Sequence, residues 1–217
     1  MSSAMIERIW SSIFETLYMV AVSGLISIVI GIALGVALYV TRPRQILAMP
    51  VLNSVLSIIV NVGRSVPFII LALAIVPFTK LLVGSFIGNT AAIVPLTIAA
   101  IPFVARLIEG ALNEVQPGLV EAAQSMGATP RQIITKVLLP EARGGIITGV
   151  TITFIALIGY SAMAGAVGAG GLGAIAINYG YNRYNSLVML ITVAIMVILV
   201  QGIQMLGDYL VRRANHK

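Results

Sequence analysis

Long apolar stretches separated by short charged segments dominate the pattern of this chain. Each stretch reaches the length of about 20 residues that a helix needs to cross a bilayer. The pattern predicts membrane-spanning helices at residues 16–41, 58–79, 81–105, 145–167 and 184–207. We therefore expect an all-α membrane protein with five transmembrane helices in a single domain over residues 12–210.

A second feature of the pattern is the uncharged segment 144–182, which is too long for one span. Glycines cluster between Gly165 and Gly173 in this segment. Glycine is the residue that most readily permits a sharp change of backbone direction. We expect the fourth span to end there, followed by a re-entrant or external segment.

Composition agrees with the membrane assignment. Of the 217 residues, 59% are hydrophobic and 9% are charged, and the mean hydropathy is +1.05, whereas soluble domains carry about 25% charged residues. The net charge of +6 comes from cations that lie between the apolar stretches and not along one helix face. Cysteine is absent, which excludes disulfides and thiolate sites.

The distribution of the cations predicts the orientation of the chain, because cytoplasmic loops are enriched in Lys and Arg. With the N-terminus outside and the C-terminus in the cytoplasm, only Arg8, Lys80 and Arg183 of the 13 basic residues lie outside. The others then lie on the cytoplasmic side: Arg42, Arg44, Arg64, Arg106, Arg131, Lys136, Arg143, Arg212, Arg213 and Lys217. This orientation places the polar loop 106–143 in the cytoplasm.

Local signals within this loop predict two short helices and a turn. Residues 118–126 are typical of a helix that Gly127 ends in a left-handed conformation. Thr129 and Gln132 have the spacing of a capping box at the start of the next helix. We expect Pro140 to close the segment.

The chemistry of the chain argues against two alternative functions, DNA binding by the loop and dinucleotide binding by the glycine cluster. A DNA-binding helix-turn-helix would carry clustered cations, whereas residues 113–143 are balanced in charge. Gly168, Gly170 and Gly173 match the G-x-G-x-x-G pattern of dinucleotide sites, yet they lie in an apolar stretch without a βαβ unit. No Walker A sequence occurs either, so another subunit must hydrolyse any ATP that drives this protein.

The loop resembles the EAA loop of permease subunits of binding-protein-dependent ABC importers, with Val137 where the family more often has isoleucine. The resemblance implies a type I ABC importer permease in the bacterial inner membrane, whose coupling helix docks onto an ATPase and whose Glu121 helps to hold the loop. The docking residues that it implies are Glu121, Ala122, Ala123, Met126, Gly127, Ala128, Thr129, Arg131, Leu139 and Pro140.

A wider similarity, to the permease subunits of methionine importers, covers nearly the whole chain. It is carried by residues 64–68, 77–79, 92–97, 159–173 and 178–185. This similarity implies a homodimer that transports L- or D-methionine with two cytoplasmic ATPase subunits and a substrate-binding lipoprotein. ATP and magnesium would be held by the ATPases, so we expect no cofactor, metal or catalytic residue on this chain, which is not itself an enzyme.

Tyr160, Ser161 and Met163 are our candidates for the translocation pathway, because they lie where the fourth span meets the glycine-rich bend. A flexible thioether suits a gate, and the two hydroxyls can meet a polar amino acid. The alternative is that all three only pack between helices.

An ion-coupled secondary transporter of small amino acids is the alternative function. Proton coupling usually needs an intramembrane carboxylate, whereas Glu109 and Asp208 lie at the edges of spans. Sodium binding by backbone carbonyls stays open.

Overall fold

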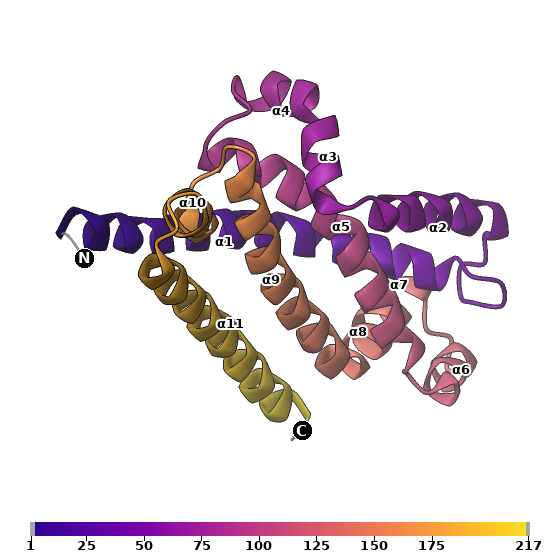
Figure 1. The fold of residues 1–217 in the computed structure, drawn as a ribbon. Helices are drawn as coiled ribbons and strands as arrows, with labels where there is room; N and C mark the ends of the chain where they lie inside the picture. Colours follow the sequence, from indigo (N-terminus) through magenta and orange to yellow (C-terminus); the bar gives the residue numbers. More distant parts are fainter. Residues whose placement is uncertain (1–2, 216–217) are drawn as a thin grey trace. The chain divides into compact units, whose positions relative to one another are not determined.

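The structure is a computed structural model that describes residues 3–215, so the predicted cytoplasmic cation Lys217 lies outside the described part. Within that part the chain is almost entirely helical and contains no strand (Figure 1). The all-α prediction is confirmed.

Four helices are long and apolar enough to cross a membrane, among the residues described. They are α1 (Ser3–Val40), α5 (Asn89–Asn113), α9 (Arg143–Ala166) and α11 (Ser186–Asn215). Helix α1 begins well before the predicted residue 16, and its length of about 57 Å exceeds the hydrocarbon core of about 30 Å. A helix of this length crosses the apolar layer with a tilt or extends beyond it.

The structure corrects the predicted second span, because residues 58–79 do not form one helix. Helix α2 (Pro50–Ser65) is followed by α3 (Phe68–Ala74) with a bend of 102°. Pro67 disfavours a helical conformation at the residue before it, which ends α2 at this point. Five spans are reached only if this bent pair counts as one span.

The predicted third span, 81–105, is shifted as well. Helix α4 (Val76–Val83) ends at Gly84, whose φ is 79°, and α5 begins only at Asn89. Gly88 is also left-handed, with a φ of 104°. Helix α5 then continues to Asn113, so the polar loop begins later than the predicted residue 106.

The described residues form two compact units, and each of the four long helices contributes residues to both. The first unit comprises Met1–Ser27, Val66–Ala100 and Thr153–Gln204, and its core contains Met19, Leu96 and Leu157. The second unit comprises Ile28–Ser65, Ile101–Ile152 and Met205–Lys217, with a separate core around Ile108 and Leu138.

In the first unit, the glycine cluster bends the chain as predicted. Helix α9 ends at Ala166, and the chain resumes as α10 (Gly171–Ile175) and the π-helix η2 (Ala176–Tyr181). The backbone N–H groups at this bend donate to side chains of α1 and α5: Gly170 to Asn89 Oδ1 at 2.8 Å, Gly171 to Glu15 Oε2 at 2.6 Å and Leu172 to Thr16 Oγ1 at 2.9 Å. The bend is thereby fastened to two other helices.

Close helix packing accompanies these bonds. A Cβ atom added at Gly173 would lie 2.4 Å from the Ala162 Cα atom, so α9 and α10 are in backbone contact. In the second unit, a Cβ atom at Gly35 would lie 2.6 Å from the Ala105 carbonyl oxygen. Small residues at such positions are the usual means by which membrane helices pack.

The backbone contact between α9 and α10 gives a test by substitution. Gly173→Ala should destabilise the protein by about 2 kcal/mol, within the range for overpacked sites, because only backbone atoms face the added methyl group. Gly159→Ala is the matched control, since its added Cβ meets no atom within 4 Å. Thermal unfolding in detergent measures both, and equal melting temperatures for the two variants would contradict the contact.

Candidate functional site

The polar loop folds into a hairpin over residues 117–141, which we call the 117–141 hairpin. It contains α6 (Pro117–Ser125), α7 (Pro130–Ile133), the π-helix η1 (Ile134–Leu138) and α8 (Leu139–Glu141). The predicted pair of helices and turn is confirmed. Gly127 has a φ of 78°, and the Ala128 N–H donates to the Ala123 carbonyl oxygen at 3.0 Å, which completes the hydrogen bonding of the helix end.

The start of α7 is fixed by the predicted capping box. The Thr129 backbone N–H donates to Gln132 Oε1 at 2.8 Å, and the Gln132 backbone N–H donates to Thr129 Oγ1 at 3.4 Å. All of these groups lie within four residues of one another. The turn between the two helices is therefore held by its own sequence.

Pro140 does not close the segment, contrary to prediction. The helix passes through Pro140 to Glu141, and α9 begins at Arg143. A proline inside a helix lacks the N–H donor and crowds the carbonyl group of the residue four positions earlier. The wider π turn at Ile134–Leu138 directly precedes it and changes the hydrogen-bonding register there, with the Leu139 N–H donating to the Ile134 carbonyl.

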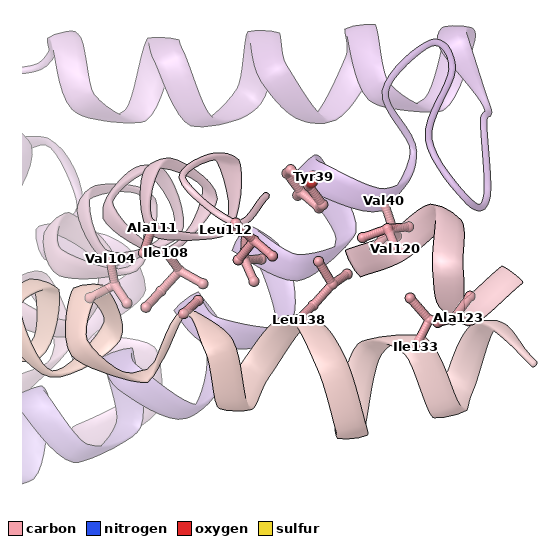
Figure 2. Close-up of a cluster of buried hydrophobic side chains, with 12 residues drawn as sticks. Tyr39, Val40, Val104, Ile108, Ala111, Leu112, Val120, Ala123, Ile133 and Leu138 are labelled. Atoms are coloured by element: carbon pink, nitrogen blue, oxygen red, sulfur yellow. The ribbon is translucent and has the colours of Figure 1, made fainter. Parts of the chain in front are cut away.

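Beneath the hairpin lies a core that its two arms share. Val120 and Ala123 of α6 pack with Ile133 of α7 and Leu138 of η1, and all four are buried (Figure 2). The same cluster includes residues of α1 and α5: Tyr39, Val40, Val104, Ile108, Ala111 and Leu112. Among the implied docking residues, Ala123 thus serves the core of the hairpin.

Most other docking residues implied by the resemblance form the outer surface of the hairpin. Met126 is 82% exposed at the turn, although it is a large apolar side chain. Ala128 and Leu139 are half-buried, whereas the following are exposed: Glu121, Ala122, Gly127, Thr129, Arg131 and Pro140. Within the described residues the Glu121 carboxylate makes no hydrogen bond or ion pair, so the apolar core and the capping box hold the hairpin instead.

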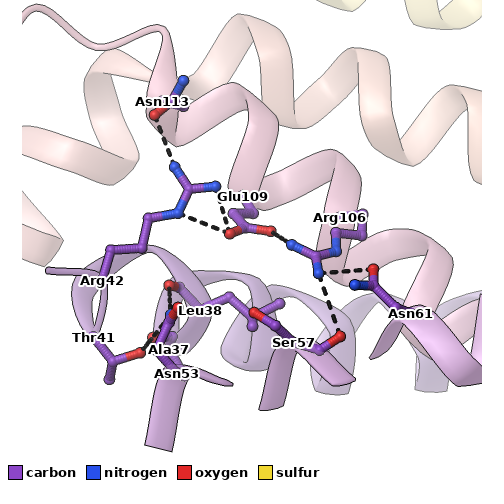
Figure 3. A network of polar contacts seen from close by, with 10 residues as sticks. All are labelled: Ala37, Leu38, Thr41, Arg42, Asn53, Ser57, Asn61, Arg106, Glu109 and Asn113. Atoms are coloured by element: carbon purple, nitrogen blue, oxygen red, sulfur yellow. Dashed lines mark hydrogen bonds and ion pairs between the residues drawn. The ribbon is translucent and has the colours of Figure 1, made fainter. Parts of the chain in front are cut away.

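A buried ionic network, which the sequence did not predict, lies in the same unit as the hairpin (Figure 3). The Glu109 carboxylate, 4% exposed, accepts from Arg42 Nη2 at 2.6 Å and from Arg106 Nη1 at 2.5 Å. Arg42 also donates to Asn113 Oδ1 at 2.9 Å, and Arg106 donates to Asn61 Oδ1 at 2.8 Å. The network joins the α1–α2 connection, α2 and α5.

Glu109 also connects this network to the hairpin through its own helix. Ile108 and Leu112 flank it on α5, and both belong to the core beneath the hairpin. An uncompensated buried charge is expensive, so the three ionic groups hold one another in place. The hairpin core and the network therefore form adjacent parts of one packed region.

The predicted pathway residues have different surroundings, although Tyr160 and Met163 are three positions apart and so lie on the same side of α9. Tyr160 stacks on Phe68 with ring centroids 5.0 Å apart and planes 5° apart. Ser161 is buried, and its hydroxyl donates to the Ile158 carbonyl oxygen at 2.8 Å. Met163 is 49% exposed and is therefore available to a partner or to the pathway.

Metal binding would need a cluster of ligands, and within residues 3–215 no three His, Cys, Asp or Glu side chains are grouped to hold an ion.

The ionic network makes a direct prediction for stability. Glu109→Leu leaves Arg42 and Arg106 without their shared counter-charge and should destabilise the protein by about 3 kcal/mol, the lower end for a broken buried pair because both arginines are partly exposed. The exposed Glu114, near the same end of α5, supplies the control: Glu114→Gln should change stability by less than about 0.5 kcal/mol. Thermal unfolding in detergent distinguishes them, and a harmless Glu109→Leu would disprove the structural role of the network.

Comparison with known proteins identifies the family of this arrangement. The family model for the binding-protein-dependent transport system inner membrane component matches residues 31–216. The probable D-methionine transport system permease protein of Vibrio cholerae is 59% identical over 211 residues, which cover 97% of this chain and 94% of the relative. The D-methionine transport system permease protein of Escherichia coli K12 is 54% identical over 165 residues, 76% of each chain.

Comparison with solved structures supports the same family. A chain from a methionine ABC transporter in an inward-facing conformation superposes with a TM-score of 0.97 at 54% identity, covering 99% of both chains. An amino acid ABC transporter structure with histidines, 22% identical, shares the fold with a TM-score of 0.80. These likenesses favour the ABC permease over an ion-coupled transporter. The chain belongs to the family of binding-protein-dependent transport system inner membrane components and has the type I ABC importer permease fold.

Proposed function

We propose that this chain forms the pathway by which an ATP-driven importer carries methionine across the inner membrane. The observation that carries the proposal is the agreement in fold and sequence, over essentially the whole chain, with a methionine transporter and with D-methionine permeases. Either stereoisomer of methionine is compatible with it. A substrate-binding lipoprotein delivers the amino acid on the outer side.

The 117–141 hairpin is the surface that docks onto the ATPase in this proposal. Its support is that a buried core, shared with α1 and α5, and a capping box hold the hairpin, while the exposed Met126 lies at its turn. A surface built in this way transmits a push or a pull without changing shape. Each chain carries one hairpin, so a motor with two ATPase subunits calls for two copies of the chain.

Coupling then follows from the fold. ATP and magnesium, held by the ATPases, draw these subunits together, and the two hairpins move with them. Each hairpin shares its core with α1 and α5, so its displacement moves spans and opens the pathway to the other side. Hydrolysis resets the assembly.

The proposed orientation has the N-terminus outside and the C-terminus in the cytoplasm, because this arrangement puts the hairpin on the side where ATP is present. In the pathway we assign the gate to Met163, whose thioether is half exposed and directly precedes the glycine-rich bend. Tyr160 positions this part of α9 by stacking on the Phe68 ring, whereas the Ser161 hydroxyl bonds within α9 to the Ile158 carbonyl.

Met126 tests the docking surface. Met126→Glu places a charge on an apolar contact. It should weaken association with the ATPase at least about tenfold, because an interface loses about this much when a central apolar anchor is removed. Methionine uptake should fall in parallel. Met126→Leu keeps the apolar surface and is the matched control. Copurification of the ATPase and uptake by proteoliposomes measure the effect, and unchanged copurification of the Glu variant would exclude docking through this turn.

The energy source and the substrate are tested together in proteoliposomes that contain this chain, its ATPase and its binding protein. Labelled methionine should cross the membrane only when ATP is present on the side that carries the ATPase. A sodium or proton gradient alone should drive no uptake. Omission of the ATPase is the control. Uptake driven by an ion gradient in its absence would support the secondary transporter instead.

A further inference from the structure

A polar cavity of about 520 Å³ lies in the first unit, where the start of α1 meets α10 and η2. Small residues such as Ser11, Gly170 and Ala174 leave the space open. The side chains that give it chemical character are those of Arg8, Glu15, Asn178, Tyr179 and Arg183. None of them belongs to the hairpin or to the predicted pathway.

Two cations converge on one aromatic ring in this cavity. The Arg183 guanidinium carbon lies 4.6 Å from the centroid of the Tyr179 ring, and that of Arg8 lies 5.4 Å from it. Arg8 also donates a hydrogen bond to the Tyr179 hydroxyl. The ring stabilises the Arg183 guanidinium by a cation–π contact, whereas the Arg8 guanidinium lies at the hydroxyl end of the same ring. Two neighbouring guanidinium groups repel each other, so an anion between them lowers the free energy of the pair.

A single carboxylate lines the same cavity. Glu15 Oε2 accepts from the Gly171 N–H at 2.6 Å, which orients the carboxylate, and the Asn178 amide lies on the same lining. A purely anionic ligand would meet this negative charge. A ligand that carries both an anion and an ammonium group satisfies the arginines and the carboxylate together.

The surroundings of the cavity indicate the source of such a ligand. On α1, Trp10 and Phe14 are 64% and 57% exposed, and their rings are in edge contact with centroids 5.5 Å apart. Tyr181 and Tyr184, which follow the cavity residue Tyr179, are 69% and 91% exposed. Exposed aromatic side chains near the end of a membrane span mark the level of the lipid head groups. Farther along α1, Leu25 is 62% exposed and continues the apolar surface.

We propose that this cavity binds the head group of an aminophospholipid such as phosphatidylethanolamine. The phosphate lies between Arg8 and Arg183, the ammonium group faces the Glu15 carboxylate and the Asn178 amide oxygen, and the acyl chains lie along α1. A free amino acid carries the same two charges. The exposed apolar and aromatic surface beside the cavity favours the lipid, because only the lipid has chains to cover it.

Native mass spectrometry of the whole purified transporter tests the proposal by titration with phosphatidylethanolamine, phosphatidylglycerol and phosphatidylcholine. We expect the wild type to prefer phosphatidylethanolamine. Arg183→Gln should weaken this binding about tenfold, the loss expected for one charge-assisted contact. Arg183 is exposed in the turn before α11, so the variant keeps the fold. Lys80→Gln removes an exposed cation of α4 outside the cavity and should bind like the wild type.

Glu15→Gln separates recognition of the ammonium group from general attraction to anions. The glutamine keeps an oxygen acceptor for the Gly171 N–H and removes the charge. The preference for phosphatidylethanolamine over phosphatidylglycerol should therefore disappear in this variant, without loss of phosphatidylglycerol binding. Three results would each overturn the proposal. The wild type could show no preference for phosphatidylethanolamine, Arg183→Gln could bind this lipid as tightly as the wild type, or free methionine could displace the lipid.

Discussion

Lipid cannot hydrogen-bond a polypeptide backbone, and this constraint governs how the chain can depart from a straight helix. At the bend between α9 and α10 three consecutive N–H groups lose their helical partners. Side chains of α1 and α5 accept all three, through Glu15, Thr16 and Asn89. The bend is possible because these acceptors are present, and their positions fix where α10 lies within the first unit. The polar cavity and the position of Met163 both depend on this arrangement.

In the second unit, a polar hairpin is packed against apolar spans. The apolar core holds it there, since Ile108 and Leu112 of α5 pack in the same cluster as Ile133 and Leu138 of the hairpin. The Glu109 network then ties α5 to α2 and to the α1–α2 connection. A hairpin mounted in this way is suited to passing force into the spans.

How much of this was predictable from the sequence depended on the distance over which each feature is determined. The capping box of Thr129 and Gln132 and the left-handed Gly127 involve only neighbours, and both were predicted correctly. The pairing of Arg42 with Glu109 joins residues 67 positions apart, and the sequence pattern identifies Glu109 only as a carboxylate at the edge of a span. No local pattern specifies such a partner.

The hydropathy of the sequence also does not report changes in the direction of the chain. Residues 58–79 are apolar on both sides of the bend, so the profile gave no sign of the 102° change at Pro67. The proline itself was the available signal. Similarly, closeness in sequence groups Tyr160, Ser161 and Met163, whereas their surroundings differ: the first stacks on an aromatic ring, the second is buried and the third is exposed. Long-range packing around α9 determines these differences.

The π turn at Ile134–Leu138 has a consequence for how this region tolerates changes in length. Successive residues of an α-helix are offset by about 100° around the axis, and a π turn accommodates one residue more than an α turn does. Loss of a single amino acid here would restore regular α-helical winding and leave α6 and α7 in nearly the same rotational position relative to α9. The same deletion in a regular α-helix would rotate the elements beyond it by about 100°. The π turn therefore makes this segment more tolerant of a one-residue deletion than the regular helix on either side.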